Sequence, residues 1–263
     1  MALRSALLNV MVMAARKAAR GLARDFGEVE QLQVSRKGPA DFVSAADHRV
    51  EKLLVTELRK ARPDWGFKLE EGGEIEGRDP THRWVIDPLD GTTNFLHGVP
   101  HFAISIGVER EGEPICGVIL DPVKDELFSA EKGGGAFLND RRLRVSARKN
   151  LPDALIATGL PFNGREGHEL SARELAVMMP EIAGIRRMGA ASLDLAYVAA
   201  GRYDGFWERG LAPWDVCAGI VMVREAGGVV TTLQGAGDPL AGGSILAAND
   251  SLHGPLKTLL AKA

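Results

Sequence analysis

The chain has 263 residues, of which 45% are hydrophobic and 25% are charged, with a formal net charge of −3. This balance is typical of an ordinary globular protein, and it excludes a strongly basic nucleic-acid footprint and a polybasic membrane anchor. The two cysteines, Cys116 and Cys217, lie in apolar surroundings without a Cys-x-x-Cys pair. This argues against a zinc site or a disulfide framework and indicates a reducing, cytoplasmic compartment.

The N-terminal region predicts two helices. Apolar residues recur at helical spacing over 7–18 and again over 46–61. Residues 1–24 contain basic but no acidic side chains, so a targeting peptide is an alternative interpretation of the first segment. Its apolar stretch is too short to span a bilayer and no cleavage site follows it, which favours an amphipathic helix.

A turn-rich segment at 37–41 separates these helices, and strand patterns dominate after the second one. Strands are expected at 83–86, 102–110, 115–120, 127–130 and 136–138. Short turns between neighbouring strands predict hairpins, so this half is expected to be a largely antiparallel sheet covered by helices.

Strands and helices alternate after residue 150, which is typical of an α/β layer. Strands are expected at 155–158, 185–187, 203–208, 229–232 and 245–248, and helices at 169–182, 190–200, 214–226 and the C-terminus. We therefore expect an N-terminal α+β half over 1–148 and a C-terminal α/β half over 149–263.

Residues 84–95 carry the densest chemistry. An apolar strand leads to Asp87, Asp90 follows three residues later, and a proline between them restricts the backbone. Gly91 allows a tight turn and close approach of a ligand, and 92–94 resemble a helix start whose free amides could bind phosphate. Two carboxylates beside phosphate require cations, and their oxygens suit magnesium-like ions. An Asp-rich surface turn is the alternative interpretation.

Two further carboxylates are candidates with structural alternatives. Glu70 follows the apolar residues of 65–69 and precedes the strand, but a solvated loop would have the same composition. Asp215 opens a predicted helix, where a carboxylate also favours the helix dipole.

Together these segments resemble the inositol monophosphatase family. Residues 87–95, Asp-Pro-Leu-Asp-Gly-Thr-Thr-Asn-Phe, look like its first signature, and 214–219, Trp-Asp-Val-Cys-Ala-Gly, with 225–228 look like its second. The resemblance extends over nearly the whole chain and is strongest with the bacterial branch. It implies a layered αβαβα sandwich, combining α+β and α/β parts, which forms a homodimer and is a lithium-sensitive, magnesium-dependent phosphatase.

The resemblance also implies a metal site. In that family two or three Mg²⁺ ions are held by the carboxylates matching Glu70, Asp87, Asp90 and Asp215 and by the carbonyl matching Leu89. Asp87 would bridge two of the ions. This set predicts hydrolysis of a phosphate monoester of a small metabolite by water.

Catalytic roles follow from the same resemblance. Glu70 would hold the ion that carries the attacking water, and Thr92 and Asp47 would orient or deprotonate that water. No covalent phosphoenzyme is expected. The substrate would contact Leu89, Asp90, Gly91, Thr92, Arg186, Gly189, Ala190, Ala191, Glu208 and Asp215.

The chain departs from its relatives around the substrate. Ala190 stands where relatives often carry Ser or Thr, Met188 replaces a frequent small polar residue, and Leu69 precedes Glu70 where a small residue is common. The metal residues are intact, whereas the pocket for the alcohol part of the substrate is altered.

Several alternatives remain open at this point. The metabolite is expected to be inositol monophosphate, with histidinol phosphate, fructose bisphosphate or a nucleoside 3′,5′-bisphosphate as alternatives. A regulatory contact with the transcription machinery is a further hypothesis, which the sequence itself does not support. His97 and His101 have metal-pair spacing, but Pro100 between them argues against that role, and 133–135 suit a hairpin turn better than a P-loop.

Overall fold

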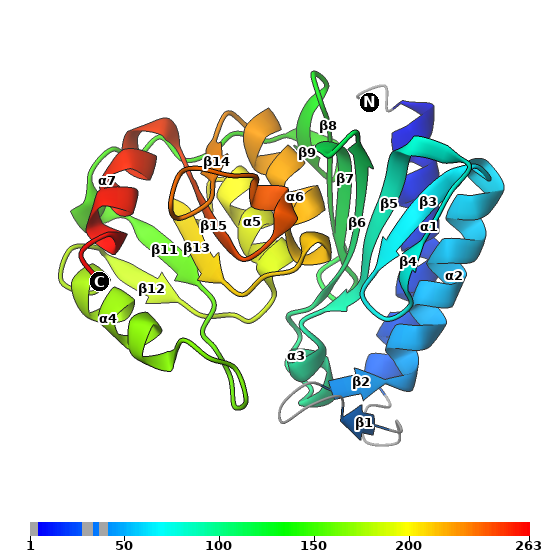
Figure 1. The fold of residues 1–263 in the computed structure, drawn as a ribbon, viewed down its shortest axis with the longest axis horizontal. Coiled ribbons are helices and arrows are strands. Elements are labelled where there is room, and N and C mark those ends of the chain that lie inside the picture. Colours follow the sequence, from blue (N-terminus) through cyan, green and yellow to red (C-terminus); the bar gives the residue numbers. More distant parts are fainter. Residues whose placement is uncertain (1–4, 28–33, 37–41) are drawn as a thin grey trace.

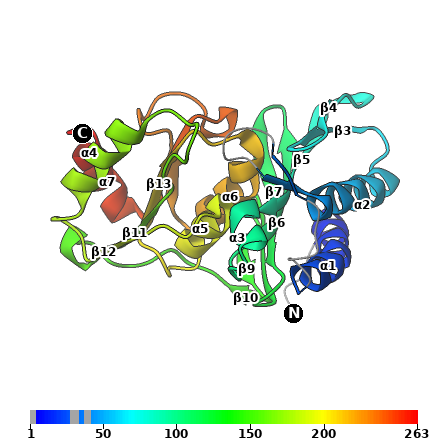
Figure 2. The ribbon, with the colours of Figure 1, turned by 90° about the horizontal axis from the view of Figure 1, so that it is seen from below.

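The computed structural model describes residues 5–27, 34–36 and 42–263, and the protein is built in αβαβα layers (Figure 1). One helix pair covers the outer face of a large sheet, a second pair lies between the two sheets, and a third pair covers the smaller sheet. These pairs are α1 (Ala6–Phe26) with α2 (Ala45–Ala61), α5 (Ala191–Ala199) with α6 (Pro213–Glu225), and α4 (His168–Met178) with α7 (Asp250–Leu260). Figure 2 shows α4 and α7 together at the end of the molecule opposite α1 and α2. The expected layered architecture is confirmed.

The large sheet has eight strands in the order β10-β9-β8-β7-β6-β5-β3-β4. All neighbours are antiparallel except β3 and β5, which run parallel. The strands are β3 (Trp65–Leu69), β4 (Gly73–Ile75), β5 (Asp79–Asp90), β6 (Ala103–Arg110), β7 (Glu113–Asp121), β8 (Glu126–Glu131), β9 (Gly135–Leu138) and β10 (Arg141–Arg142).

The smaller sheet has five strands in the order β12-β11-β13-β15-β14. Strand β11 is parallel to both of its neighbours, and the pairs formed by β15 are antiparallel. The strands are β11 (Leu155–Thr158), β12 (Gly184–Arg186), β13 (Gly205–Arg209), β14 (Val229–Thr231) and β15 (Ser244–Ala248). A separate antiparallel pair joins β1 (Val34–Arg36) to β2 (Phe42–Ser44). The short helical elements are α3 (Thr92–Leu96), η2 (Leu151–Asp153) and η3 (Pro239–Ala241).

Helix α1 confirms the amphipathic interpretation of the N-terminal segment. It begins after Ser5, whose hydroxyl accepts a hydrogen bond from the Leu8 amide at 3.1 Å. Its apolar face, including Met11 and Leu22, is buried against α2 and the large sheet. No helix within the described residues has the length and apolar character needed to cross a bilayer.

Small residues on the inner face of the large sheet let α6 approach it closely. A Cβ placed on Gly107 would lie 2.4 Å from Cys217 Sγ, and one on Gly117 would lie 2.7 Å from the Ala218 carbonyl oxygen. Neither space can hold a side chain, so glycine is required at both positions. This packing fixes the height of α6 above the sheet and therefore the position of Asp215 in its first turn.

The structure differs from the predicted elements mainly around the acidic residues. Strand β3 was not predicted, and β5 is twelve residues long, continuing past Asp87 to Asp90 where the sequence predicted a strand ending at Asp87. The pairing of β5 with β6 shifts register between Asp87 and Asp90, so the irregularity lies within the strand. The turn expected at 37–41 lies outside the described residues.

Candidate active site

A cavity of about 780 Å³ lies where β5, α3, α5 and α6 meet the loop that joins β11 to α4. Eight of the expected site residues line it, and they come from both halves of the chain. They are Glu70, Asp90, Gly91, Thr92, Gly189, Ala191, Glu208 and Asp215.

Glu70 and Asp87 are brought together by the parallel pairing of β3 with β5. The carboxyl ends of parallel neighbours lie at the same edge of a sheet, and the Glu70 amide donates to the Ile86 carbonyl at 3.3 Å. Asp87 is 2% exposed, and its Oδ1 accepts from the Leu89 amide at 2.9 Å. The Thr92 hydroxyl donates to the Leu89 carbonyl at 2.9 Å. Asp87, Leu89 and Thr92 therefore form one hydrogen-bonded turn.

Asp90 faces the N-terminus of α5. Its Oδ2 accepts from the backbone amide of Ser192 at 2.8 Å and from the Ser192 hydroxyl. The amides of Ala191 and Leu193 also stabilise its charged form. The helix N-terminus thus partly compensates the negative charge of Asp90.

Asp215 enters the cavity from the first turn of α6. Its Oδ2 accepts from the Ala212 amide at 2.7 Å, so the residue also caps its own helix. The capping and site interpretations of Asp215 are compatible, because the carboxylate has a second oxygen.

The cavity carboxyl groups repel one another and are poorly solvated. Burial, followed by the charges of Glu70, Asp90 and Asp215, raises the pKa of Asp87 well above its usual value. Burial also raises the pKa of Asp90 to about 6, against the lowering effect of its Ser192 contacts. The pKa of Asp215 rises to about 8 through burial and the nearby charge of Asp90.

These shifts indicate an excess of negative charge that cations would relieve. The interaction of Asp87 with the Glu70 side chain adds to the raised pKa of Asp87. Within the described part of the chain, no three acidic, histidine or cysteine side chains already form a coordination shell. The four carboxylates are nevertheless close enough to influence one another's pKa. Their oxygen donors fit hard divalent ions such as Mg²⁺.

Some expected site residues lie behind the cavity wall. Asp47 is buried in the first turn of α2, and Asp87, Leu89 and Ala190 are also buried outside the lining. The backbone carbonyl of Leu89 accepts the hydrogen bond from Thr92, which lines the cavity. Ala190 is the residue that precedes α5.

Of the two neighbouring arginines, Arg187 and not Arg186 lines the cavity. The exposed Arg186 donates to the carbonyl of its neighbour Ile185. Burial raises the pKa of Tyr203 and that of Glu208; the charge of Arg186 partly offsets the first shift and the charge of Arg187 partly offsets the second. Arg186 is the last residue of β12, and Arg187 begins the segment that leads from β12 into the cavity wall. The substrate contact expected for Arg186 stays a prediction, and the cavity lining favours its neighbour Arg187 for that role.

Glu208 reaches the cavity because Gly159 has no side chain. A Cβ at Gly159 would lie 1.8 Å from the Glu208 Cδ atom. Burial, followed by the charges of Asp215 and Asp90, raises the pKa of Glu208 to about 8. The sequence carried no signal for Gly159, because its function depends on the strand packed beside it.

The loop between β11 and α4 contributes a residue that sequence reasoning missed. Arg165 lies in the cavity lining, with its guanidinium carbon 5.0 Å from the centre of the Phe162 ring. Its charge lowers the pKa of Asp215. The sequence Gly-Arg-Glu-Gly at 164–167 has no pattern that predicts a functional site.

The layered fold places an acidic cavity beside the N-termini of α3 and α5, an arrangement that suits hydrolysis of a phosphate ester. Residues 3–263 match the model of the inositol monophosphatase family, and the chain belongs to this family. Members of the family depend on metal ions.

Relatives cover almost the full chain. It is 61% identical to the inositol-1-monophosphatase of Rhizobium meliloti (strain 1021) over 257 residues, covering 98% of this chain and 97% of that protein. It is 47% identical to the Nus factor SuhB of Pseudomonas aeruginosa, covering 97% of this chain and 95% of that protein. The crystal structure of extragenic suppressor protein suhB from Bartonella henselae superposes with a TM-score of 0.95 at 57% identity, covering 98% of this chain and 100% of that one.

Proposed function

We propose that this protein hydrolyses inositol monophosphate, or a closely similar polyol phosphate, with Mg²⁺ as its cofactor. The observation that carries the proposal is the meeting of Glu70, Asp87, Asp90 and Asp215 beside the α3 N-terminus. The similarity to an inositol-1-monophosphatase supports the choice of substrate.

Glu70, Asp87, Asp90, Asp215 and the Leu89 carbonyl would hold two or three Mg²⁺ ions. When bound, the ions would neutralise phosphate charge, lower the pKa of water and stabilise the leaving oxygen. The raised pKa values of Asp87, Asp90 and Asp215 support this assignment, because a cation would stabilise the ionised carboxylates that burial and mutual repulsion disfavour.

The phosphate end of the substrate would bind at the start of α3. Gly91 has φ +91°, and a Cβ there would lie 3.0 Å from the His101 carbonyl oxygen. Glycine therefore permits a turn that presents the amides of Gly91 and Thr92 to phosphate oxygens. The Thr92 hydroxyl donates to Leu89, so its lone pairs remain available to orient the attacking water. Asp47 is proposed to help accept the proton of that water.

The alcohol end would lie against the opposite wall. Glu208 would accept hydrogen bonds from substrate hydroxyls, Arg187 would take the place expected for Arg186, and Gly189 and Ala191 would provide a close surface. Water would attack phosphorus directly and the ester oxygen would leave with a proton, so no covalent phosphoenzyme is proposed.

A phosphate-release screen tests this proposal. Inositol 1-phosphate, histidinol phosphate, fructose bisphosphate and a nucleoside 3′,5′-bisphosphate should be compared with Mg²⁺ and with a chelator. We expect Mg²⁺-dependent release that is fastest from inositol 1-phosphate. Release that persists in chelator would contradict the metal assignment, and preference for another phosphate would contradict the substrate. The same assay with lithium tests the expected inhibition.

The similarity to Nus factor SuhB supports a second proposal, a contact with the transcription machinery. Co-elution of the protein with RNA polymerase would support it, and separate elution at micromolar concentrations would count against it. Sedimentation of the protein alone tests the homodimer expected from the family, and cell fractionation tests the cytoplasmic location.

A further inference from the structure

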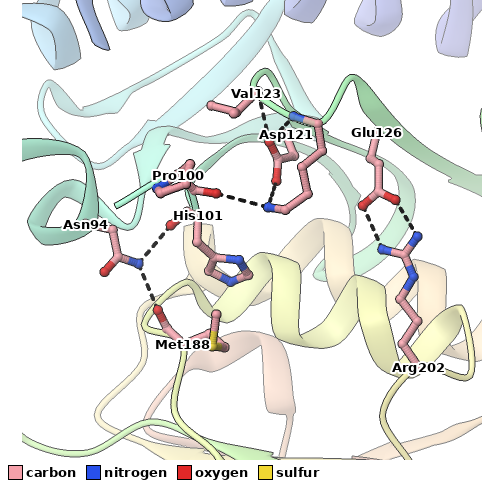
Figure 3. A network of polar contacts seen from close by, with 9 residues as sticks. Asn94, Pro100, His101, Asp121, Val123, Glu126, Met188 and Arg202 are labelled. Atoms are coloured by element: carbon pink, nitrogen blue, oxygen red, sulfur yellow. Dashed lines mark hydrogen bonds and ion pairs between the residues drawn. The ribbon is translucent and has the colours of Figure 1, made fainter. Parts of the chain in front are cut away.

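Asn94 lines the cavity and joins the segment at 100–101, which lies outside the lining, to the segment at 187–189, whose Arg187 and Gly189 line it. Its side-chain Nδ2 donates to the His101 carbonyl and to the Met188 carbonyl, each at 2.8 Å (Figure 3). A carboxamide nitrogen has two hydrogens, so both are used. Both partners are acceptors, which fixes the orientation of the amide.

The His101 side of this link is firmly anchored. Lys124 Nζ donates to the carbonyl of Pro100, the residue before His101, at 3.1 Å and pairs with the fully buried carboxylate of Asp121. Asp121 also accepts the backbone amides of Val123 and Lys124 at 2.9 Å. The chain at 100–101 is therefore a fixed support for Asn94.

The Met188 side carries the wall that faces the alcohol part of the substrate. Arg187 and Gly189, which flank Met188, both line the cavity. A Cβ at Gly189 would lie 2.6 Å from Arg187 Nη1 and 3.6 Å from Asn94 Nδ2. The absence of a side chain at Gly189 thus allows the guanidinium and the amide to pack against the same backbone.

The same segment is held a second time, further along the chain, where the Ser192 amide donates to Asp90. That second attachment involves a proposed metal ligand, whereas the Asn94 attachment uses only neutral backbone carbonyls. Asn94 can therefore hold the wall independently of the charge state of the carboxylates.

We propose that Asn94 is a positioning residue that sets the separation between the phosphate-binding turn at 91–92 and the substrate-facing wall at 187–189. It acts through the backbone of Met188 and not by contact with the reacting atoms. For its kinetic consequence the inference rests on the proposed function, because that wall must meet a polyol.

The variant Asn94→Asp tests the link, because it keeps the shape and an oxygen atom but removes the donor facing two carbonyls. We expect its loss of kcat/KM on inositol 1-phosphate to exceed its loss on p-nitrophenyl phosphate about tenfold, mainly through KM, as for one or two lost hydrogen bonds. The aryl phosphate has no hydroxyl groups for the wall to position. In hydrogen–deuterium exchange without substrate, amides of 187–193 should exchange faster.

Asn249 provides a matched control. Its Nδ2 also donates to two carbonyls, those of Ser146 at 3.0 Å and Arg148 at 2.9 Å, but Asn249 lies outside the cavity lining. Asn249→Asp removes the same pair of bonds and should leave both the substrate ratio and exchange in 187–193 unchanged.

Unchanged exchange in Asn94→Asp, or equal losses on the two phosphates, would overturn the proposal. If Asn94→Asp does not fold, Asn94→Ala removes the same donor without adding charge and is judged by the same measurements. If the wild type does not release phosphate from inositol 1-phosphate, the proposed function fails, and the exchange data alone decide the role of Asn94.

Discussion

The contact between Gly159 and Glu208 allows a sharp test of how the substrate is recognised. A methyl group at position 159 would lie 1.8 Å from both Cδ and Oε1 of Glu208. Ordinary contacts between such atoms are about 3.5–4.0 Å, so Gly159→Ala should displace the carboxylate by about 2 Å. The atoms that must move are at the end of a flexible side chain, and the backbone of β13 can stay in place.

Misplacement of a substrate-positioning group by about 1 Å can lower activity about a hundredfold. We therefore expect Gly159→Ala to lower kcat/KM for inositol 1-phosphate between tenfold and about a hundredfold, with a smaller effect on p-nitrophenyl phosphate. The free energy of unfolding should change by less than about 2 kcal/mol, since overpacking is offset by the lower backbone entropy of alanine in the unfolded chain.

Steady-state phosphate release and thermal unfolding measure these two effects separately. Gly184→Ala in the neighbouring strand is the matched control, because its Cβ would meet other atoms no closer than 3.6 Å. Wild-type KM in Gly159→Ala would refute the proposed contact of Glu208 with substrate. A large loss of stability would show instead that the backbone and not Glu208 absorbs the clash.

Further predictions concern the acidic residues and the arginines. Asp90→Asn should abolish phosphate release while circular dichroism shows the fold retained, and full turnover would contradict the metal scheme. Without metal, the raised pKa of Asp215, about 8, means that its contribution to stability is present below about pH 4 and is lost as the pH rises through 8. The melting temperature in chelator should therefore fall over this range more in the wild type than in Asp215→Asn. At pH 8, Mg²⁺ at a hundred times its Kd should raise the free energy of unfolding by about 2.7 kcal/mol, which is seen as a higher melting temperature. An unchanged melting temperature would count against a metal site. Arg187→Ala should raise KM for inositol 1-phosphate and Arg186→Ala should not; the reverse result would favour the original expectation.

Much of the fold could be predicted from local patterns. The helices at α1 and α2 follow apolar periodicity, and the hairpin of β6 and β7 follows two apolar runs with a turn between them. Strand β3 was missed because it is short and contains Gly66, whose Cβ would lie 2.9 Å from the Ile75 carbonyl oxygen. The close approach of β4 requires glycine at position 66, whereas local strand propensity disfavours glycine. The division of the chain at 148 and 149 stays a prediction.

The candidate site was predictable where residue types and spacing carry the chemistry. Asp87 and Asp90 belong to one short motif, so their proximity follows from the sequence. The position of Glu70 depends on the parallel pairing of β3 with β5, and that of Arg187 depends on the path of the chain just after β12. Both are consequences of tertiary packing, which a single sequence does not reveal.

The placement of Asp215 on α6 has a consequence for how the protein is made. During synthesis the large sheet leaves the ribosome first, with Asp87 and Asp90 in β5 and Glu70 in the turn between β3 and β4. The carboxylate of Asp215 arrives only with α6, which then docks onto Gly107 and Gly117. A nascent chain can therefore hold most of the acidic residues without the complete site, so phosphatase activity should begin only when the C-terminal half folds.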